Sequence, residues 1–209
     1  GGLELKGGGA FTLTDAGNSV STLAAGTGAG VLRYVNAGAL TVGTVNSVGV
    51  TRTGDTLINT QTGNLTLAQS INVGTGNSLR LQSVAGKVDQ TGGTITAGTL
   101  GVNAATSINL ASNNAVATTF AAKATNGNLL FKNANGYDIN TVAADGTQFT
   151  LVDGVTAVAA STNITLEAGS GTVTQTSGKL VRTDTGGSGA TGGLELKGGG
   201  AFTLTDAGN

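Results

Sequence analysis

Four acidic residues in the last third of the chain form the densest group of side chains that could perform chemistry. They are Asp138, Asp145, Asp153 and Glu167. Glycoside hydrolysis needs two carboxyl groups at a defined separation, one acting as acid and the other as base or nucleophile. No spacing here fixes such a pair, and Asp138 aligns with Thr41 in an internal duplication of the chain. We interpret the four as solvated or turn residues and predict no catalytic residue.

The residue types that most catalytic and metal sites require are missing. The sequence has no His, Cys or Met, so it lacks the imidazole and thiolate groups that bind zinc and act as bases or nucleophiles. Glycine accounts for 37 of 209 residues, yet neither the GxxxxGK[ST] phosphate-binding loop nor the GGxGxD phrase of calcium-binding β-rolls occurs. The sequence predicts no metal, no cofactor and no enzymatic activity.

Charge is sparse and nearly balanced. Ten Lys and Arg residues stand against eleven Asp and Glu, scattered along the chain. Nucleic acids and anionic lipids are bound by clustered basic residues, and a transmembrane helix needs about 20 consecutive apolar residues. Apolar residues here occur as pairs and triplets between Gly, Asn, Thr and Ser. We therefore predict no nucleic-acid partner and no membrane span.

The chain contains an unaltered repeat. Residues 1–18, GGLELKGGGAFTLTDAGN, recur as residues 192–209, which gives a period of 192 − 1 = 191 residues. An unchanged match of this length predicts a tandem array, the pattern of repeat architectures. We expect residues 1–191 to form one unit and residues 192–209 to open the next, identical unit.

A weaker similarity lies inside the unit at an offset of 97 residues. Residues 30–37 align without gaps on residues 127–134, and Leu3 and Phe11 fall on Leu100 and Ile108. The similarity predicts two half-units, about 1–97 and 98–191.

Apolar-polar-apolar triplets recur along the whole chain. Examples are Leu65-Thr66-Leu67, Ile71-Asn72-Val73 and Ile108-Asn109-Leu110. Since side chains at i and i+2 share one face of a strand, each triplet buries two aliphatic residues and exposes one polar residue. Gly and Asn between the triplets reach positive φ most easily and predict tight corners. No segment has a helical pattern with caps, so we predict an all-β fold.

Two all-β architectures fit short strands at this spacing. One is a parallel β-solenoid, and the alternative is a row of tandem β-sandwich domains of about 95 residues each. Sandwich cores rely on large aromatic residues and on turns with Pro, whereas this chain has two Tyr, five Phe, no Trp and no Pro. Solenoid turns can be filled by Val, Leu, Ile and Ala. We therefore favour the solenoid, with about 8 to 10 turns per unit and an advance of about 40 to 48 Å.

The same phrases resemble a known family. Residues 18–25 (NSVSTLAA), 63–67 (GNLTL), 163–166 (NITL) and 171–176 (GTVTQT) are similar to the filamentous haemagglutinin-like repeats of large bacterial surface proteins, many of them adhesins. The resemblance implies a right-handed parallel β-helix, export across the bacterial envelope, and an extracellular stalk or fibre at the cell surface.

The leading functional hypothesis is structural: a repeat of a secreted surface filament or adhesin stalk that provides mechanical reach and display. Its expected partners are neighbouring copies of the repeat, with lateral bundling of fibres. The alternative is an adhesive module that binds glycans or receptors on other cells, for which Tyr34, Phe131 and Tyr137 are too few to form an outward aromatic ladder. A carbohydrate-active β-helix enzyme is the third hypothesis and would need a cleft outside the repeat pattern.

Overall fold

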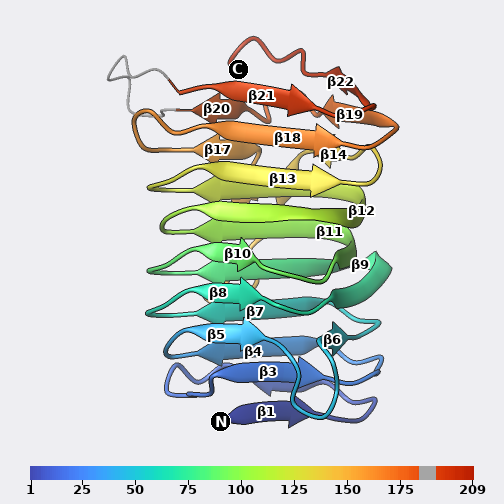
Figure 1. Cartoon of the computed structure of the whole chain (residues 1–209), viewed down its shortest axis with the longest axis vertical. Helices are drawn as coiled ribbons and strands as arrows, with labels where there is room; N and C mark the ends of the chain where they lie inside the picture. Colours follow the sequence, from blue (N-terminus) through green and yellow to red (C-terminus); the bar gives the residue numbers. More distant parts are fainter. Residues whose placement is uncertain (184–191) are drawn as a thin grey trace.

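The apolar-polar-apolar triplets form short strands that pair with their equivalents one turn further along the chain. The computed structural model describes residues 1–183 and 192–209, which contain 22 strands and no helix. Twenty strands belong to one sheet with parallel pairing, and they coil in about eight turns along one axis (Figure 1). The predicted parallel β-helix is confirmed, and this continuous parallel sheet excludes antiparallel sandwiches. No helix in the described part is long and apolar enough to cross a membrane.

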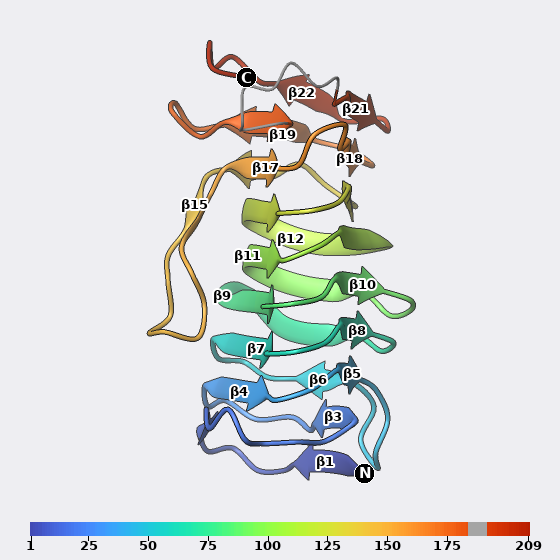
Figure 2. The ribbon, with the colours of Figure 1, turned by 90° about the vertical axis from the view of Figure 1, so that its left-hand side faces the viewer.

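Two long faces run along the coil on opposite sides (Figure 2). Face A, turned toward the viewer in Figure 1, consists of β1 (Gly2–Leu5), β3 (Thr22–Ala25), β5 (Leu40–Val42), β8 (Leu65–Leu67), β10 (Val88–Gln90), the first part of β12 (Ile108–Ala124), β13 (Leu129–Asn133), β18 (Ile164–Ala168) and β21 (Leu194–Lys197).

Face B closes the coil on the other side. It consists of β2 (Phe11–Leu13), β4 (Leu32–Asn36), β7 (Thr56–Thr60), the last parts of β9 (Ile71–Ser83), β11 (Ile95–Ala104) and β12, then β14 (Asp138–Ile139), β17 (Val155–Ala157), β19 (Thr172–Gln175), β20 (Val181–Thr183) and β22 (Ala201–Thr203). A short row of β6 (Val50–Thr51) and the first parts of β9 and β11 lies between the faces.

The interior is a continuous stack of aliphatic side chains with an aromatic cluster toward its C-terminal end. Leu110, like most inward positions of the triplets, is fully buried. The rings of Phe120 and Phe131 stack with centroids 3.8 Å apart, and Tyr137 meets both edge-on. Tyr34, Phe131 and Tyr137, which are too few for an outward aromatic ladder, are all buried in the interior.

Asparagine side chains bridge neighbouring turns. At the corners, Oδ1 of Asn64 accepts a hydrogen bond from the amide of Lys87, and Oδ1 of Asn163 accepts one from Gly193. Buried Asn133 bonds both backbone groups of Val116, at 2.8 and 2.9 Å. Corner amides thus satisfy backbone groups that the strands leave unpaired.

Two loops are inserted into the middle of strands. Residues 43–49 separate β5 from β6 opposite Ala24, and residues 140–154 separate β14 from β17 opposite Ala121. The second loop contains the antiparallel hairpin β15 (Thr141–Val142) and β16 (Val152–Asp153). Both loops fold back along the outside, so Ala24 and Ala121 are fully buried although they point away from the interior.

The positions of these two loops can be compared with the predicted half-units. The two alanines are 121 − 24 = 97 residues apart, the offset of the internal similarity. Leu3 and its aligned Leu100 lie on faces A and B, and Phe11 and Ile108 lie on faces B and A. Aligned residues are therefore about half a turn out of phase.

The number of residues in eight turns of strand pairing differs slightly from the period of the sequence repeat. One ladder of paired residues on face A runs through Gly2, Thr22, Thr41, Thr66, Asp89, Asn109, Leu130, Thr165 and Glu195. It spans 195 − 2 = 193 residues in eight turns, against the period of 191. The second copy of the repeated segment is therefore shifted by two positions, and an even shift keeps Leu194 and Leu196 on the inward side. Eight turns advance about 38 Å, near the lower end of the expected range.

Replacing Leu110 by Asp should prevent folding or destabilise the chain strongly. The change removes a fully buried side chain, which alone costs about 2–5 kcal/mol, and adds an unpaired buried charge. Leu130→Asp is the matched control, because Leu130 is an outward position of β13 and partly exposed. Urea unfolding followed by circular dichroism measures both, and equal stability of the two variants would contradict the inward assignment.

Replacing Tyr137 by Phe should raise the free energy of unfolding by about 1 kcal/mol. The Tyr137 hydroxyl is buried without a hydrogen-bond partner among the described residues, and an unpaired buried hydroxyl is unfavourable. Tyr34→Phe is the control and should lower stability by a similar amount, because the Tyr34 hydroxyl donates to Oδ1 of Asn36 at 3.0 Å. The prediction is wrong if both variants lose stability equally.

Candidate functional site

The four acidic residues considered as a catalytic group each bond to partners of their own. Asp138 accepts hydrogen bonds from the hydroxyls of Thr174 and Thr176, 2.8 and 2.7 Å away. Asp153 pairs with Lys179 at 3.0 Å and Glu167 with Lys132 at 2.8 Å, while Asp145 pairs with Arg33. In residues 1–183 and 192–209, no three acidic residues gather as a metal site would require. These carboxylates tie segments of the coil to one another.

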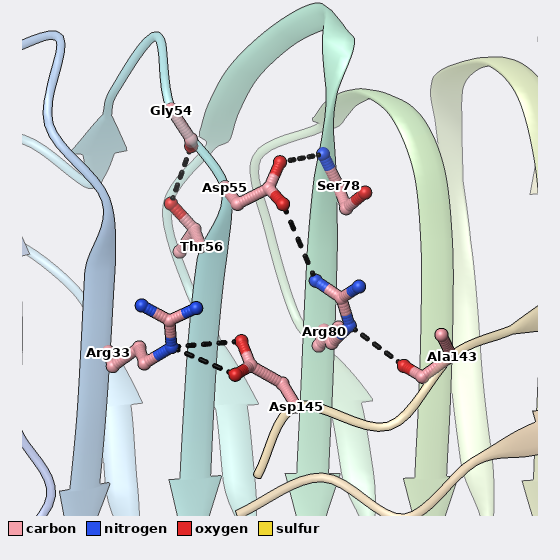
Figure 3. A network of polar contacts seen from close by, with 8 residues as sticks. All are labelled: Arg33, Gly54, Asp55, Thr56, Ser78, Arg80, Ala143 and Asp145. Carbon is pink, nitrogen blue, oxygen red and sulfur yellow. Dashed lines mark hydrogen bonds and ion pairs between the residues drawn. The ribbon is translucent and has the colours of Figure 1, made fainter.

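The Arg33–Asp145 contact belongs to a polar network under the inserted hairpin (Figure 3). Nε of Arg33 donates to both carboxylate oxygens of Asp145 at 2.9 and 3.0 Å. Nε of Arg80 donates to the carbonyl of Ala143 at 3.0 Å, and its guanidinium lies 3.8 Å from the carboxylate of Asp55. Arginines of face B thus anchor both the tip and one arm of the hairpin loop.

Apolar packing holds the same loop against face B. Phe149, Val142 and Val152 pack with Leu57 and Ala121 in a second buried cluster outside the coil. The loop runs along the outward row Arg33, Leu57, Arg80, Gly101 and Ala121, which belongs to five consecutive turns. A Cβ on Gly101 would lie 2.7 Å from the side chain of Val142. Residues 140–154 are therefore a strap across five turns.

The repeated segment occupies both ends of the structure, so its two copies can be compared. Its two copies adopt the same local backbone: Gly7 has φ 108° and its counterpart Gly198 has φ 100°. The carboxylate of Asp15 accepts a bond from the amide of Gly17 at 2.7 Å, as Asp206 does from Gly208 at 3.0 Å. One sequence therefore folds into the same turn at both ends of the structure.

The two copies use opposite backbone edges. In the first copy, the amide of Phe11 donates to Val31 of the following turn at 2.8 Å. In the second copy, the amide of Ala201, the counterpart of Ala10, donates to Gly171 of the preceding turn at 2.8 Å. Successive amides of a strand point to opposite neighbours. A single copy of the segment can therefore pair with a turn on each side.

Burial of identical side chains shows the effect of a covering turn. Leu5 in the first copy is 5% exposed, because β3 stacks over it. Its counterpart Leu196 stacks on Leu166 of β18 but is 41% exposed. The second copy thus exposes an apolar surface whose counterpart in the first copy is covered by β3.

Arg52 holds the glycine corner of the first copy. Its guanidinium is fully buried and donates to the carbonyls of Gly7 and Gly9 at 2.9 and 2.6 Å, and to Gly30 at 3.1 Å. It also lies over the ring of Phe11, 5.2 Å from the centroid. Backbone carbonyls thus replace the water that a buried guanidinium loses.

Glu4 is held by the inserted loop 43–49. Its carboxylate accepts hydrogen bonds from the hydroxyl and amide of Ser47 at 2.5 and 2.8 Å and from the side chain of Asn46 at 2.7 Å. These bonds, above all that from the Ser47 hydroxyl, lower the pKa of Glu4 to about 2. Its counterpart Glu195 bonds Lys197 and Thr165, which also lower its pKa, with Lys197 contributing most.

Comparison with known proteins gives no relative. No protein-family model, no curated protein and no solved structure matches the chain.

Sequence reasoning identified the repeated segment but missed the residues that hold it. Arg52, Ser47 and Asn46, which hold this segment, are single polar residues without a spacing pattern. The one available signal was Arg52 itself, a charged residue between Thr51 and Thr53 in a chain with few charges.

The hydrogen bonds from Ser47 and Asn46 to Glu4, called the Glu4 clasp below, predict a specific pH dependence. The pKa of Glu4 is about 2 in the folded chain against 4.5 for an unperturbed Glu, so its contribution to stability is complete above about pH 4.5 and declines as the pH falls toward 2. The difference in unfolding free energy between the wild type and Glu4→Gln should shrink over this range. Glu195→Gln is the matched control and should show a smaller effect. Equal effects of the two substitutions would rule out the clasp.

Proposed function

We propose that the chain is a structural repeat of a long rod, in which the solenoid continues from one 191-residue unit to the next. The observation that carries the proposal is the paired behaviour of the repeated segment. It is a first turn at one end and a last turn at the other, with the same backbone and opposite bonded edges. In an array, one copy would make both sets of contacts.

A solenoid that continues from unit to unit would also leave no open sheet edge between the units. An exposed edge strand is a template for unwanted pairing, and terminal turns of solenoids usually need caps. In an array, a turn with the sequence of residues 19–36 would cover Leu194 and Leu196, as it covers Leu3 and Leu5 in the first unit. Each unit would therefore cap the one before it.

The physical basis of the role would be axial hydrogen bonding. Backbone bonds between parallel turns run along the rod, and the strap 140–154 links five turns on the outside. Such a segment resists bending and extension without any special residue. We propose that it serves as a stalk of a secreted filament or adhesin on the bacterial surface, which is the role that the haemagglutinin-like phrases imply.

The adhesive alternative has less support from the side chains. Glycan-binding surfaces present exposed aromatic rings, and Tyr34, Phe131 and Tyr137 are all buried. We therefore propose reach and display, with neighbouring copies of the repeat as partners and lateral contact between rods as a further association.

Chains of one, two and three units test the proposal. Electron microscopy should show straight rods whose length grows by about 38 Å per added unit, the rise of eight turns. A parallel binding assay on a glycan array and on whole cells separates display from adhesion. Beads joined by flexible links would contradict the rod, and saturable glycan binding by one unit would favour the adhesive role.

A further inference from the structure

We infer that the last turn of one chain can take the place of the first turn of a second copy, so that separate chains join end to end. The inference rests on the proposed rod and identifies a partner for it. The partner is a second molecule of this chain, and the surface is the side of residues 19–52 that the first copy of the repeated segment now covers.

The accepting surface is defined by backbone and side chains. Its strands β3 and β4 pair with residues 2–5 and 11–13 of the first copy. Three side chains add specific contacts: Arg52 binds the carbonyls of the glycine corner, and Ser47 and Asn46 bind the Glu4 carboxylate. The surface therefore recognises an extended strand, a glycine corner and an acidic side chain in fixed order.

The second copy presents the same groups in the same order. Its Glu195 corresponds to Glu4, its Gly198 and Gly200 to the carbonyls that Arg52 binds, and its Phe202 to the ring beside that guanidinium. The backbone at Gly198 already has the positive φ of Gly7. Leu194 and Leu196 are 44% and 41% exposed. The glycine corner of the second copy therefore already has the backbone conformation that the accepting surface binds, while the Glu195 side chain would exchange its bond to Thr165 for bonds to Ser47 and Asn46.

Exchange between chains conserves paired strand edges. Before exchange, residues 1–18 and 192–209 each pair along one edge; afterwards, residues 192–209 pair along both and residues 1–18 along neither. The released 18 residues regain conformational freedom. Against this, the resident segment has a high effective concentration because it is tethered to the surface. Weakening the resident segment should therefore promote joining.

The chain has no Cys, so single introduced cysteines can report the junction. Arg33 pairs with Thr12 in the intact chain, and Thr203 is the counterpart of Thr12 on the second copy. The acceptor is the full chain with Leu5→Asp, which loosens its own first turn, and Arg33→Cys. The donor is the full chain with Thr203→Cys.

The control donor carries Leu196→Asp together with Thr203→Cys. Leu196 is the counterpart of Leu5, so the same substitution in the same sequence is placed on the other partner. After mixing and treatment with a short bifunctional thiol reagent, we expect acceptor–donor dimers at least about tenfold more abundant with the donor than with the control donor. Circular dichroism establishes that every variant is folded before mixing.

A second acceptor, with Arg33→Cys alone, is used in case the Leu5→Asp variant does not fold. It should cross-link more weakly, with a yield that rises with protein concentration. Equal cross-linking to donor and control donor, or none from either acceptor at any concentration, would overturn the inference. If covalently linked two-unit chains still form single straight rods, the proposed function stands without it; if they form beads, the proposed function itself fails.

Discussion

Every feature of this molecule depends on backbone hydrogen bonding between equivalent strands of successive turns. In a parallel stack, each turn has two bonding edges, and each edge needs a neighbour. The interior follows from this arrangement, because inward side chains of one turn lie directly over those of the next. The aliphatic ladder and the stacked rings of Phe120 and Phe131 are packing of like on like. Corner amides such as Asn163 supply bonds where the strands stop.

The repeated segment obeys the same rule in two environments. Its counterparts Leu5 and Leu196 differ in exposure only because one is covered by a further turn. The shift of two positions between 193 and 191 residues is tolerated because it is even. An odd shift would turn the leucines outward and the glutamate inward. Register parity, more than any individual contact, is what makes an identical segment usable as both first and last turn.

Much of this fold was predictable from the sequence, and the reason is local. A triplet such as Leu65-Thr66-Leu67 indicates both a strand conformation and which of its side chains are buried. The unchanged repeat predicts an array. The strap was not predictable, since Arg33 and Asp145 are 112 residues apart and neither belongs to a pattern. The burial of Tyr34, Phe131 and Tyr137 was also missed, because a solenoid interior can accept a large ring only where adjacent turns leave room. The clasp of Glu4 by Ser47 depends on a loop whose path no local signal gives.

We propose that one copy of the repeated segment bonds to a turn on each of its two edges. The most direct test is amide hydrogen exchange at two adjacent residues of the second copy. In the 209-residue chain, the amide of Ala201 is bonded to Gly171, while that of Phe202 corresponds to the Phe11 amide that bonds the following turn. Residue-resolved NMR on this chain and on a chain of two full units would compare them. A continuous solenoid predicts that the amide of Ala201 is protected from exchange in both chains and the amide of Phe202 only in the longer one. An unprotected Phe202 in the two-unit chain would contradict a continuous solenoid.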